Sequence, residues 1–131
     1  MVLIDTSIWI IFLNGADLKI KSKVLELLKE DKVCICPPIY QEILQAVKHK
    51  KDFNKLRDLL YGLVKLRIDP FLISQEAAEI YFNLRKAGIT VRKSYDCLIT
   101  AYAINSGVYL YHHDKDFKAI AMGTNLKQYM Q

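Results

Sequence analysis

Short apolar runs alternate with longer segments of helical periodicity along this chain, and this alternation restricts the possible folds more than any other feature. We expect strands at residues 2–4, 32–36, 66–68 and 108–111, with a last edge strand at 126–129. The segments between them are expected to form helices, at residues 7–13, 18–29, 38–47, 53–64, 74–86, 95–105 and 115–121. Strands separated by helices favour a parallel sheet covered on both faces. The chain is therefore predicted to be an α/β protein.

Residues with capping chemistry set the expected ends of several helices. Thr6 or Ser7 is expected to cap the first helix, and Ser94 the helix that begins at residue 95, because a hydroxyl oxygen accepts hydrogen bonds from free N–H groups. Gly88 is expected to close the helix at 74–86 as a C-terminal cap.

Composition narrows the class of protein further. The chain has 131 residues, of which 52% are hydrophobic and 25% charged, as in an ordinary soluble globular protein. Its apolar stretches are far shorter than a bilayer crossing needs, and it opens without a secretory leader. The three cysteines form an odd set without metal-binding spacing, which indicates packing residues in a reducing compartment. We expect residues 1–131 to form a single cytoplasmic domain.

Acidic residues occupy unusual positions in this pattern. Asp5 follows directly on an expected strand and Asp114 lies just beyond the end of another, where the working crevice of an open parallel sheet lies. Glu42 and Asp96 border the apolar stripes of two expected helices. The topology thus steers several acids toward one end of one sheet.

Each acid also has a purely structural explanation. Asp5 and Asp114 are suited to cap the helices that follow them, and Asp96 and Asp116 suit the positive N-terminal end of a helix. Glu42 has room to reach solvent past its neighbours. When the acids are considered one at a time, the structural explanation is preferred for Asp116. Gathered carboxylates repel one another, however, and a divalent cation is the usual way to hold them. Considered together, the acids favour a metal site.

Basic residues outnumber acidic ones, 19 to 14, which leaves a net charge of +5. This balance is compatible with a polyanionic partner, although a charge run by itself is more often a solvated helix face. The candidates for contact with a nucleic-acid backbone lie in two clusters, Lys48, Lys50 and Lys51, and Arg92 and Lys93.

The order of these motifs resembles that of the PIN-domain ribonucleases, and the size of the chain resembles their VapC toxins. A strand is followed by "DTS", Glu42 lies in a helix after the second strand, "SYD" opens a helix, and a later strand is followed by "HHDKDF". The similarity runs from Val2 to about Ala121. It implies a three-layer fold with a central parallel sheet in strand order 3-2-1-4-5, flanked by helices.

The resemblance also implies roles for individual residues. Asp5, Glu42, Asp96 and Asp114 match the metal-binding acids of the family, Asp116 matches an additional acid, and Thr6 or Ser7 matches a hydroxyl that helps to arrange the site. This chain departs from the family at His112, because the family often has a hydroxyl residue two places before its last acid.

The chemistry implied is metal-dependent hydrolysis of RNA phosphodiester bonds by an activated water, without a covalent enzyme intermediate. An oxygen-rich ligand set suits the hard cations Mg²⁺ and Mn²⁺, which activate a bound water and steady the leaving oxygen. The resemblance further implies the toxin of a type II toxin–antitoxin pair, a homodimer whose VapB-like antitoxin covers the acidic site.

Four alternatives remain open. A housekeeping PIN-domain RNA-processing nuclease would have much the same sequence. A phosphoacceptor receiver domain would end its first strand in paired acids, whereas Asp5 is single. A zinc hydrolase would need both His112 and His113 on one ion, although adjacent residues of a strand point to opposite faces. A non-catalytic RNA-binding module is expected to lack several of the acids.

Overall fold

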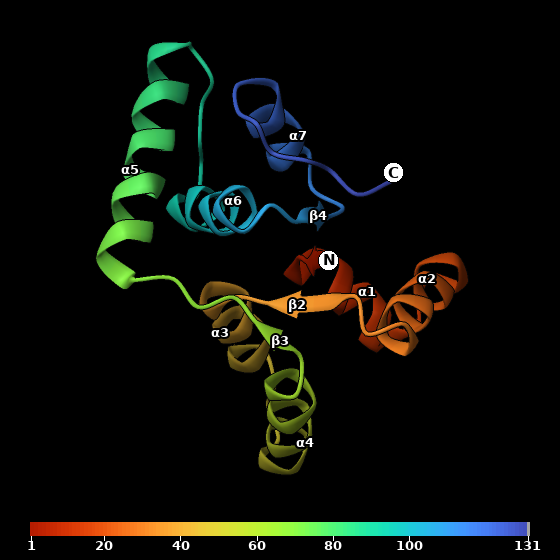
Figure 1. Cartoon of the computed structure of the whole chain (residues 1–131). Helices are drawn as coiled ribbons and strands as arrows, with labels where there is room; N and C mark the ends of the chain where they lie inside the picture. Colours follow the sequence, from red (N-terminus) through yellow and green to blue (C-terminus); the bar gives the residue numbers. More distant parts are fainter. Residues whose placement is uncertain (131) are drawn as a thin grey trace.

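A parallel four-stranded sheet lies at the centre of the structure, a computed structural model that describes residues 1–130 (Figure 1). Its strands are β1 (Val2–Ile4), β2 (Val33–Ile35), β3 (Val64–Lys65) and β4 (Tyr109–Tyr111). They are arranged in the order β3-β2-β1-β4, and all three neighbouring pairs are parallel. The predicted α/β class and the predicted order of the first four strands are confirmed.

The expected fifth strand is reduced to a single parallel bridge beside β4. Gln128 pairs with Leu110, whose N–H donates to Lys127 O at 2.8 Å and whose carbonyl accepts from Tyr129 N at 2.8 Å. Leu126 is the one buried side chain between residues 124 and 130. Tyr129 is half-buried and packs against Tyr111, so the segment is held beside β4 by this contact and by the bridge.

Within residues 1–130 the sheet is flanked by seven helices. These are α1 (Thr6–Asn14), α2 (Leu18–Lys29), α3 (Pro37–Gln45), α4 (Lys50–Tyr61), α5 (Pro70–Lys86), α6 (Ser94–Ser106) and α7 (Lys115–Met122). None of them combines the length and the hydropathy that crossing a bilayer requires.

Helices α4 and α5 begin several residues earlier than predicted. The carboxylate of Asp69 accepts a hydrogen bond from Phe71 N at 3.0 Å, so α5 begins at Pro70, where the missing N–H of proline costs nothing. Helix α4 both begins earlier, at Lys50, and ends earlier, at Tyr61, and β3 lies at residues 64–65 instead of 66–68.

The predicted N-caps of α1 and α6 are wrong. Asp5 caps α1 because a carboxylate is a strong acceptor, and Ser7 donates to it through both its N–H and its hydroxyl. Ser94 lies inside the first turn of α6. The C-terminal prediction is confirmed, because Gly88 adopts φ +80° and its N–H donates to Arg85 O at 3.0 Å.

The core surrounds β1, whose three residues are fully buried, as are the three free cysteines Cys34, Cys36 and Cys97. Helix α6 packs against both α5 and α3. This packing brings the N-terminal half of α6 beside α3 and sets the positions of the acids on both helices.

Candidate metal centre

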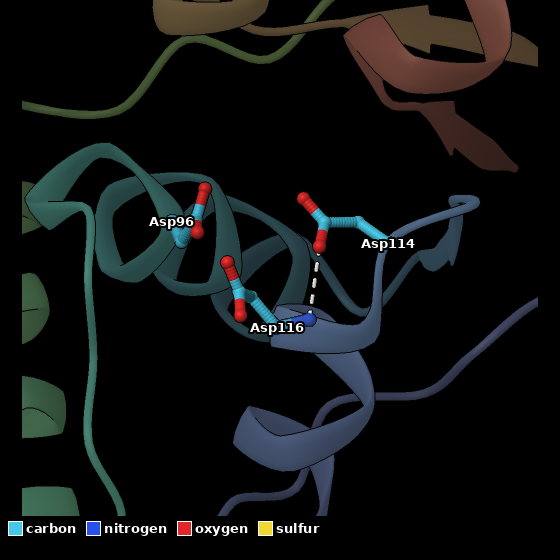
Figure 2. Close-up of side chains that lie close together, drawn as sticks. All are labelled: Asp96, Asp114 and Asp116. Atoms are coloured by element: carbon cyan, nitrogen blue, oxygen red, sulfur yellow. Dashed lines mark hydrogen bonds between the residues drawn. The ribbon is translucent and has the colours of Figure 1, made fainter.

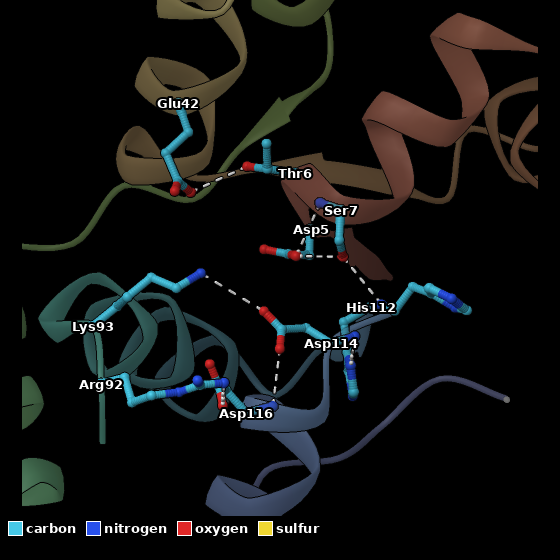
Figure 3. Close-up of polar contacts among 10 residues, drawn as sticks. Asp5, Thr6, Ser7, Glu42, Arg92, Lys93, His112, Asp114 and Asp116 are labelled. Carbon is cyan, nitrogen blue, oxygen red and sulfur yellow. Dashed lines mark hydrogen bonds and ion pairs between the residues drawn. The ribbon is translucent and has the colours of Figure 1, made fainter. Parts of the chain in front are cut away.

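The carboxyl ends of β1 and β4 are joined by a small hydrogen-bond network (Figure 3). The N–H of Asp5 donates to Tyr111 O at 2.9 Å, which continues the ladder between the two strands. The hydroxyl of Ser7 donates to Asp5 Oδ2 at 2.6 Å and accepts from His113 N at 3.0 Å. Ser7 therefore connects the acid at the end of β1 to the turn that follows β4.

Asp5 and Asp114 both act as helix caps, as the structural explanation requires. Asp5 Oδ2 accepts from Ser7 N at 3.0 Å, and Asp114 Oδ1 accepts from Asp116 N at 2.9 Å. Each cap occupies only one oxygen of its carboxylate. Capping a helix and binding a cation are therefore compatible for these residues.

Three carboxylates form a tight cluster at this edge of the sheet (Figure 2). Asp96 lies in the first turn of α6, Asp116 in the first turn of α7, and Asp114 directly before α7. One oxygen from each lies within 4.8 Å of the other two. The positive N-terminal ends of the two helices offset part of the repulsion between these acids.

Asp96 is the most deeply buried member of this cluster. Its side chain is 5% exposed, and its Oδ2 atom is buried without a hydrogen-bond partner. Burial raises the pKa of Asp96 to about 7, with smaller contributions in the same direction from Asp114 and Asp5 and an opposing one from Lys93. A buried, unpaired carboxylate oxygen beside two further carboxylates has the chemistry of a cation ligand.

The cluster fits a small divalent ion. Oxygen ligands of one octahedral ion at 2.0–2.1 Å lie about 3–4 Å from one another. The three oxygens, within 4.8 Å, need only small side-chain rotations to reach such spacing. The acidic cluster therefore indicates a divalent metal site, without specifying the ion.

Asp5 and Glu42 lie outside the three-oxygen group, although the charge of Asp5 acts on both Asp96 and Glu42. Thr6 Oγ1 donates to Glu42 Oε1 at 3.1 Å and holds that carboxylate on α3 (Figure 3). Burial raises the pKa of Glu42, and the charge of Asp5 raises it further. Asp116, for which the sequence favoured a structural explanation, stands inside the group instead.

Two of the five basic candidates reach the acids. The connection between α5 and α6 carries Arg92, whose guanidinium donates to Asp116 Oδ1 at 2.8 Å. It also carries Lys93, whose Nζ lies 3.8 Å from Asp114 Oδ2. The exposed side chains of Lys48, Lys50 and Lys51 lie beyond the C-terminal end of α3, around the start of α4.

The two adjacent histidines occupy opposite environments, as predicted for neighbours at a strand end. His112 is fully buried and His113 is exposed, so the rings do not face one metal site. His112 contacts Asp114 and Gln128 through its two ring nitrogens. Sequence reasoning missed this contact, because no local pattern links residue 112 to a partner 16 positions away.

Comparisons with known proteins give consistent results. The family model for the PIN domain matches residues 2–122. VapC ribonuclease Mb1587 of Mycobacterium bovis and ribonuclease VapC11 of Mycobacterium tuberculosis are each 39% identical over 129 residues, which covers 97% of this chain and 96% of the relative. The solved structure of VapBC-1 from nontypeable Haemophilus influenzae matches with a TM-score of 0.75 at 21% identity, covering 98% of this chain and 97% of that one.

Proposed function

The chain belongs to the PIN domain family, and from this premise we propose that it is a metal-dependent endoribonuclease that hydrolyses RNA phosphodiester bonds. The observation that carries the proposal is the cluster of carboxylate oxygens from Asp96, Asp114 and Asp116, all within 4.8 Å of one another. The names of the mycobacterial relatives, which are ribonucleases, support the choice of substrate.

The cation in this proposal is Mg²⁺ or Mn²⁺, held by Asp96, Asp114 and Asp116 with Asp5 and Glu42 beside them. When bound, such an ion lowers the pKa of a coordinated water and neutralises charge that develops on the phosphate. The residues of the chain keep the carboxylates in place for it. Ser7 orients Asp5 and Thr6 orients Glu42 through their hydroxyl groups.

Basic side chains are proposed to guide the RNA backbone toward the acids. Arg92 and Lys93 lie at the site itself, where they neutralise Asp116 and Asp114. Lys48, Lys50 and Lys51 extend the positive surface beyond α3. Cations in these two positions suit a single strand that passes across the metal centre.

The biological context that we propose is the toxin of a type II toxin–antitoxin pair, acting in the cytoplasm as one domain over residues 1–131. The names of the relatives support this assignment. A homodimer and a VapB-like antitoxin are its proposed partners. Apolar side chains on the surface are consistent with such partners, and Leu18, Tyr61 and Phe71 are exposed to 78%, 56% and 88%.

The decisive experiment separates the metal role of the acids from their capping role. Asparagine caps a helix as well as aspartate does, but it removes the charge that a cation needs. Asp5→Asn and Asp114→Asn should each lower RNA cleavage in Mn²⁺ by roughly 100-fold or more, with melting temperatures at or above that of the parent chain. Combining the two should cost little more than the worse single change, because residues that act as a unit are far from additive.

Asp17 provides a matched control. It caps α2 by accepting from Lys19 N at 2.9 Å and from Ile20 N at 3.1 Å, in an exposed position. Asp17→Asn should leave both cleavage and melting unchanged. An Asp5→Asn chain that cleaves RNA at the parent rate would show that Asp5 is only a cap.

A further inference from the structure

His112 connects the C-terminal segment to the turn that carries two of the clustered acids. Its ring is fully buried and lies 5.3 Å from the ring of Phe117 on α7, at an interplanar angle of 48°. One ring nitrogen contacts the backbone of Asp114, and the other contacts the side chain of Gln128.

The hydrogen-bond partners determine which nitrogen of the ring carries the proton. The N–H of Asp114 donates to His112 Nδ1 at 3.2 Å, so Nδ1 presents its lone pair. Nε2 is then the nitrogen that donates, and its acceptor is Gln128 Oε1 at 2.8 Å. Each nitrogen thus has a partner that suits this one tautomer.

Both ends of this connection are anchored. Asp114 caps α7 by accepting from Asp116 N at 2.9 Å, so the position of Asp114 also influences that of Asp116 in the first turn of the helix. The segment that carries Gln128 is held to β4 by the hydrogen bonds on either side of Leu110. The path therefore runs from the bridge beside β4, through an imidazole, to two of the three clustered carboxylates.

We propose that His112 is a positioning residue of the metal centre: its ring, oriented by Gln128 through Nε2, accepts from Asp114 N through Nδ1 and so holds the turn between β4 and α7 with Asp114 and Asp116 facing Asp96. The proposal rests on the proposed function only in taking the bound group to be a divalent cation. His112 itself touches neither cation nor substrate in this role.

The tautomer can be tested on the parent chain without any substitution. Long-range ¹H–¹⁵N correlation spectra of the ¹⁵N-labelled, metal-free chain at pH 7.5 should show His112 protonated at Nε2 and unprotonated at Nδ1. The spectrum of His113→Ala identifies the signals of the neighbouring ring. A His112 ring whose Nδ1 carries a proton would overturn the proposal, because such a nitrogen cannot accept from Asp114 N.

Mn²⁺ affinity, measured by titration calorimetry, tests the positioning role itself. His112→Leu keeps an apolar group in the pocket but offers no acceptor to Asp114, and it should weaken Mn²⁺ binding roughly 10–100-fold. His112→Asn places an amide oxygen near the position of Nδ1 and should recover most of that affinity. His112→Gln reaches toward Gln128 instead and should not. The exposed neighbour gives the control, because His113→Leu should bind Mn²⁺ within about twofold of the parent, well short of the effect of removing an orienting partner.

Gln128→Leu should weaken binding less than His112→Leu, and adding it to His112→Leu should cost nothing further, because both act through one ring. If His112→Leu melts earlier but binds Mn²⁺ like the parent, or if Asn rescues no better than Gln, His112 is only a core residue. RNA cleavage is assayed separately. A chain whose Mn²⁺ binding depends on His112 but which leaves RNA intact would overturn the proposed function and retain the positioning role.

Discussion

Asp96 is a buried acid of the candidate metal centre with an unpartnered carboxylate oxygen. Its buried Oδ2 has no hydrogen-bond partner, and burial raises its pKa from 3.8 to about 7. The carboxyl group of Asp96 therefore binds its proton more tightly in the folded chain than in the unfolded chain. The stability that comes from protonation is complete below about pH 4 and is lost as the pH rises through about 7.

Asp96→Asn should therefore stabilise the metal-free protein at high pH. The gain should be small near pH 4, grow as the pH rises, and level off above pH 7 at on the order of 1–4 kcal/mol. Thermal unfolding in a chelator across this range measures it. Mn²⁺ should raise the melting temperature of the parent chain at pH 8 and leave that of Asp96→Asn nearly unchanged.

The exposed acid Asp17 is again a suitable comparison, and Asp17→Asn should show no such pH-dependent gain. An Asp96→Asn gain of the same size at pH 4 and pH 8 would mean that ionisation of Asp96 is not the source of the cost.

At the level of elements, the connection between α5 and α6 has the most direct influence on the site. Gly88 ends α5 at φ +80°, and Ile89 N then donates to Leu84 O at 2.8 Å. The chain continues past the half-buried Val91 to Arg92, which reaches Asp116. A left-handed residue at the end of α5 thus directs the nearest cations toward the acids.

Gly88→Ala should destabilise the protein by about 1 kcal/mol, because the left-handed conformation is unfavourable for residues with a Cβ. Steric contact adds nothing, since an added Cβ would meet no heavy atom within 4 Å. Gly88→Asn should cost less, as asparagine tolerates this conformation. Urea denaturation at constant m-value measures both changes.

Gly62 supplies the control for this pair. It adopts an ordinary helical φ of −75°, so Gly62→Ala should be close to neutral. Equal effects at Gly62 and Gly88 would rule out backbone conformation as the cause.

For the whole molecule, the distribution of charge matters more than its total of +5. Acids gather at one edge of the sheet, with Arg92 and Lys93 directly beside them. A polyanion is attracted to such a site only through the flanking cations, because the uncompensated carboxylates repel phosphate. The cluster of Arg92 and Lys93 and the cluster of Lys48, Lys50 and Lys51 should therefore contribute separately to RNA affinity.

The salt dependence of RNA binding checks this expectation, with Asp114→Asn as the background so that the RNA stays intact. Replacing Arg92 and Lys93 by Gln should reduce the slope of log K against log salt by about 0.7 for each phosphate that the protein no longer neutralises. Replacing Lys48, Lys50 and Lys51 by Gln should reduce it further. The same charge change at exposed Lys21 and Lys29 on α2, which lies apart from α3 and α6 in Figure 1, should leave the slope unchanged. A slope lowered equally by the α2 changes would indicate net charge alone.

The sequence by itself determined the α/β class, the positions of β1, β2 and β4, and the placement of acids near strand ends. These features follow from local periodicity, because side-chain burial repeats every two residues in a strand and about every 3.6 in a helix. Strand ends are marked by the same patterns, so Asp5 and Asp114 were recognisable as residues at the edge of the sheet. Helix starts were less predictable, since the acceptor strength of Asp5 and Asp69 outweighed the hydroxyl and pattern signals nearby.

Only the tertiary structure decided which side chains meet. The packing of α6 against α3 and β4 brings Asp96 beside Asp114 and Asp116, and leaves Asp5 and Glu42 just outside that group. The contact of His112 with Gln128 depends on a bridge at the far end of the chain. Distances of a few ångströms between residues far apart in sequence depend on how whole elements pack, and local periodicity carries no information about them.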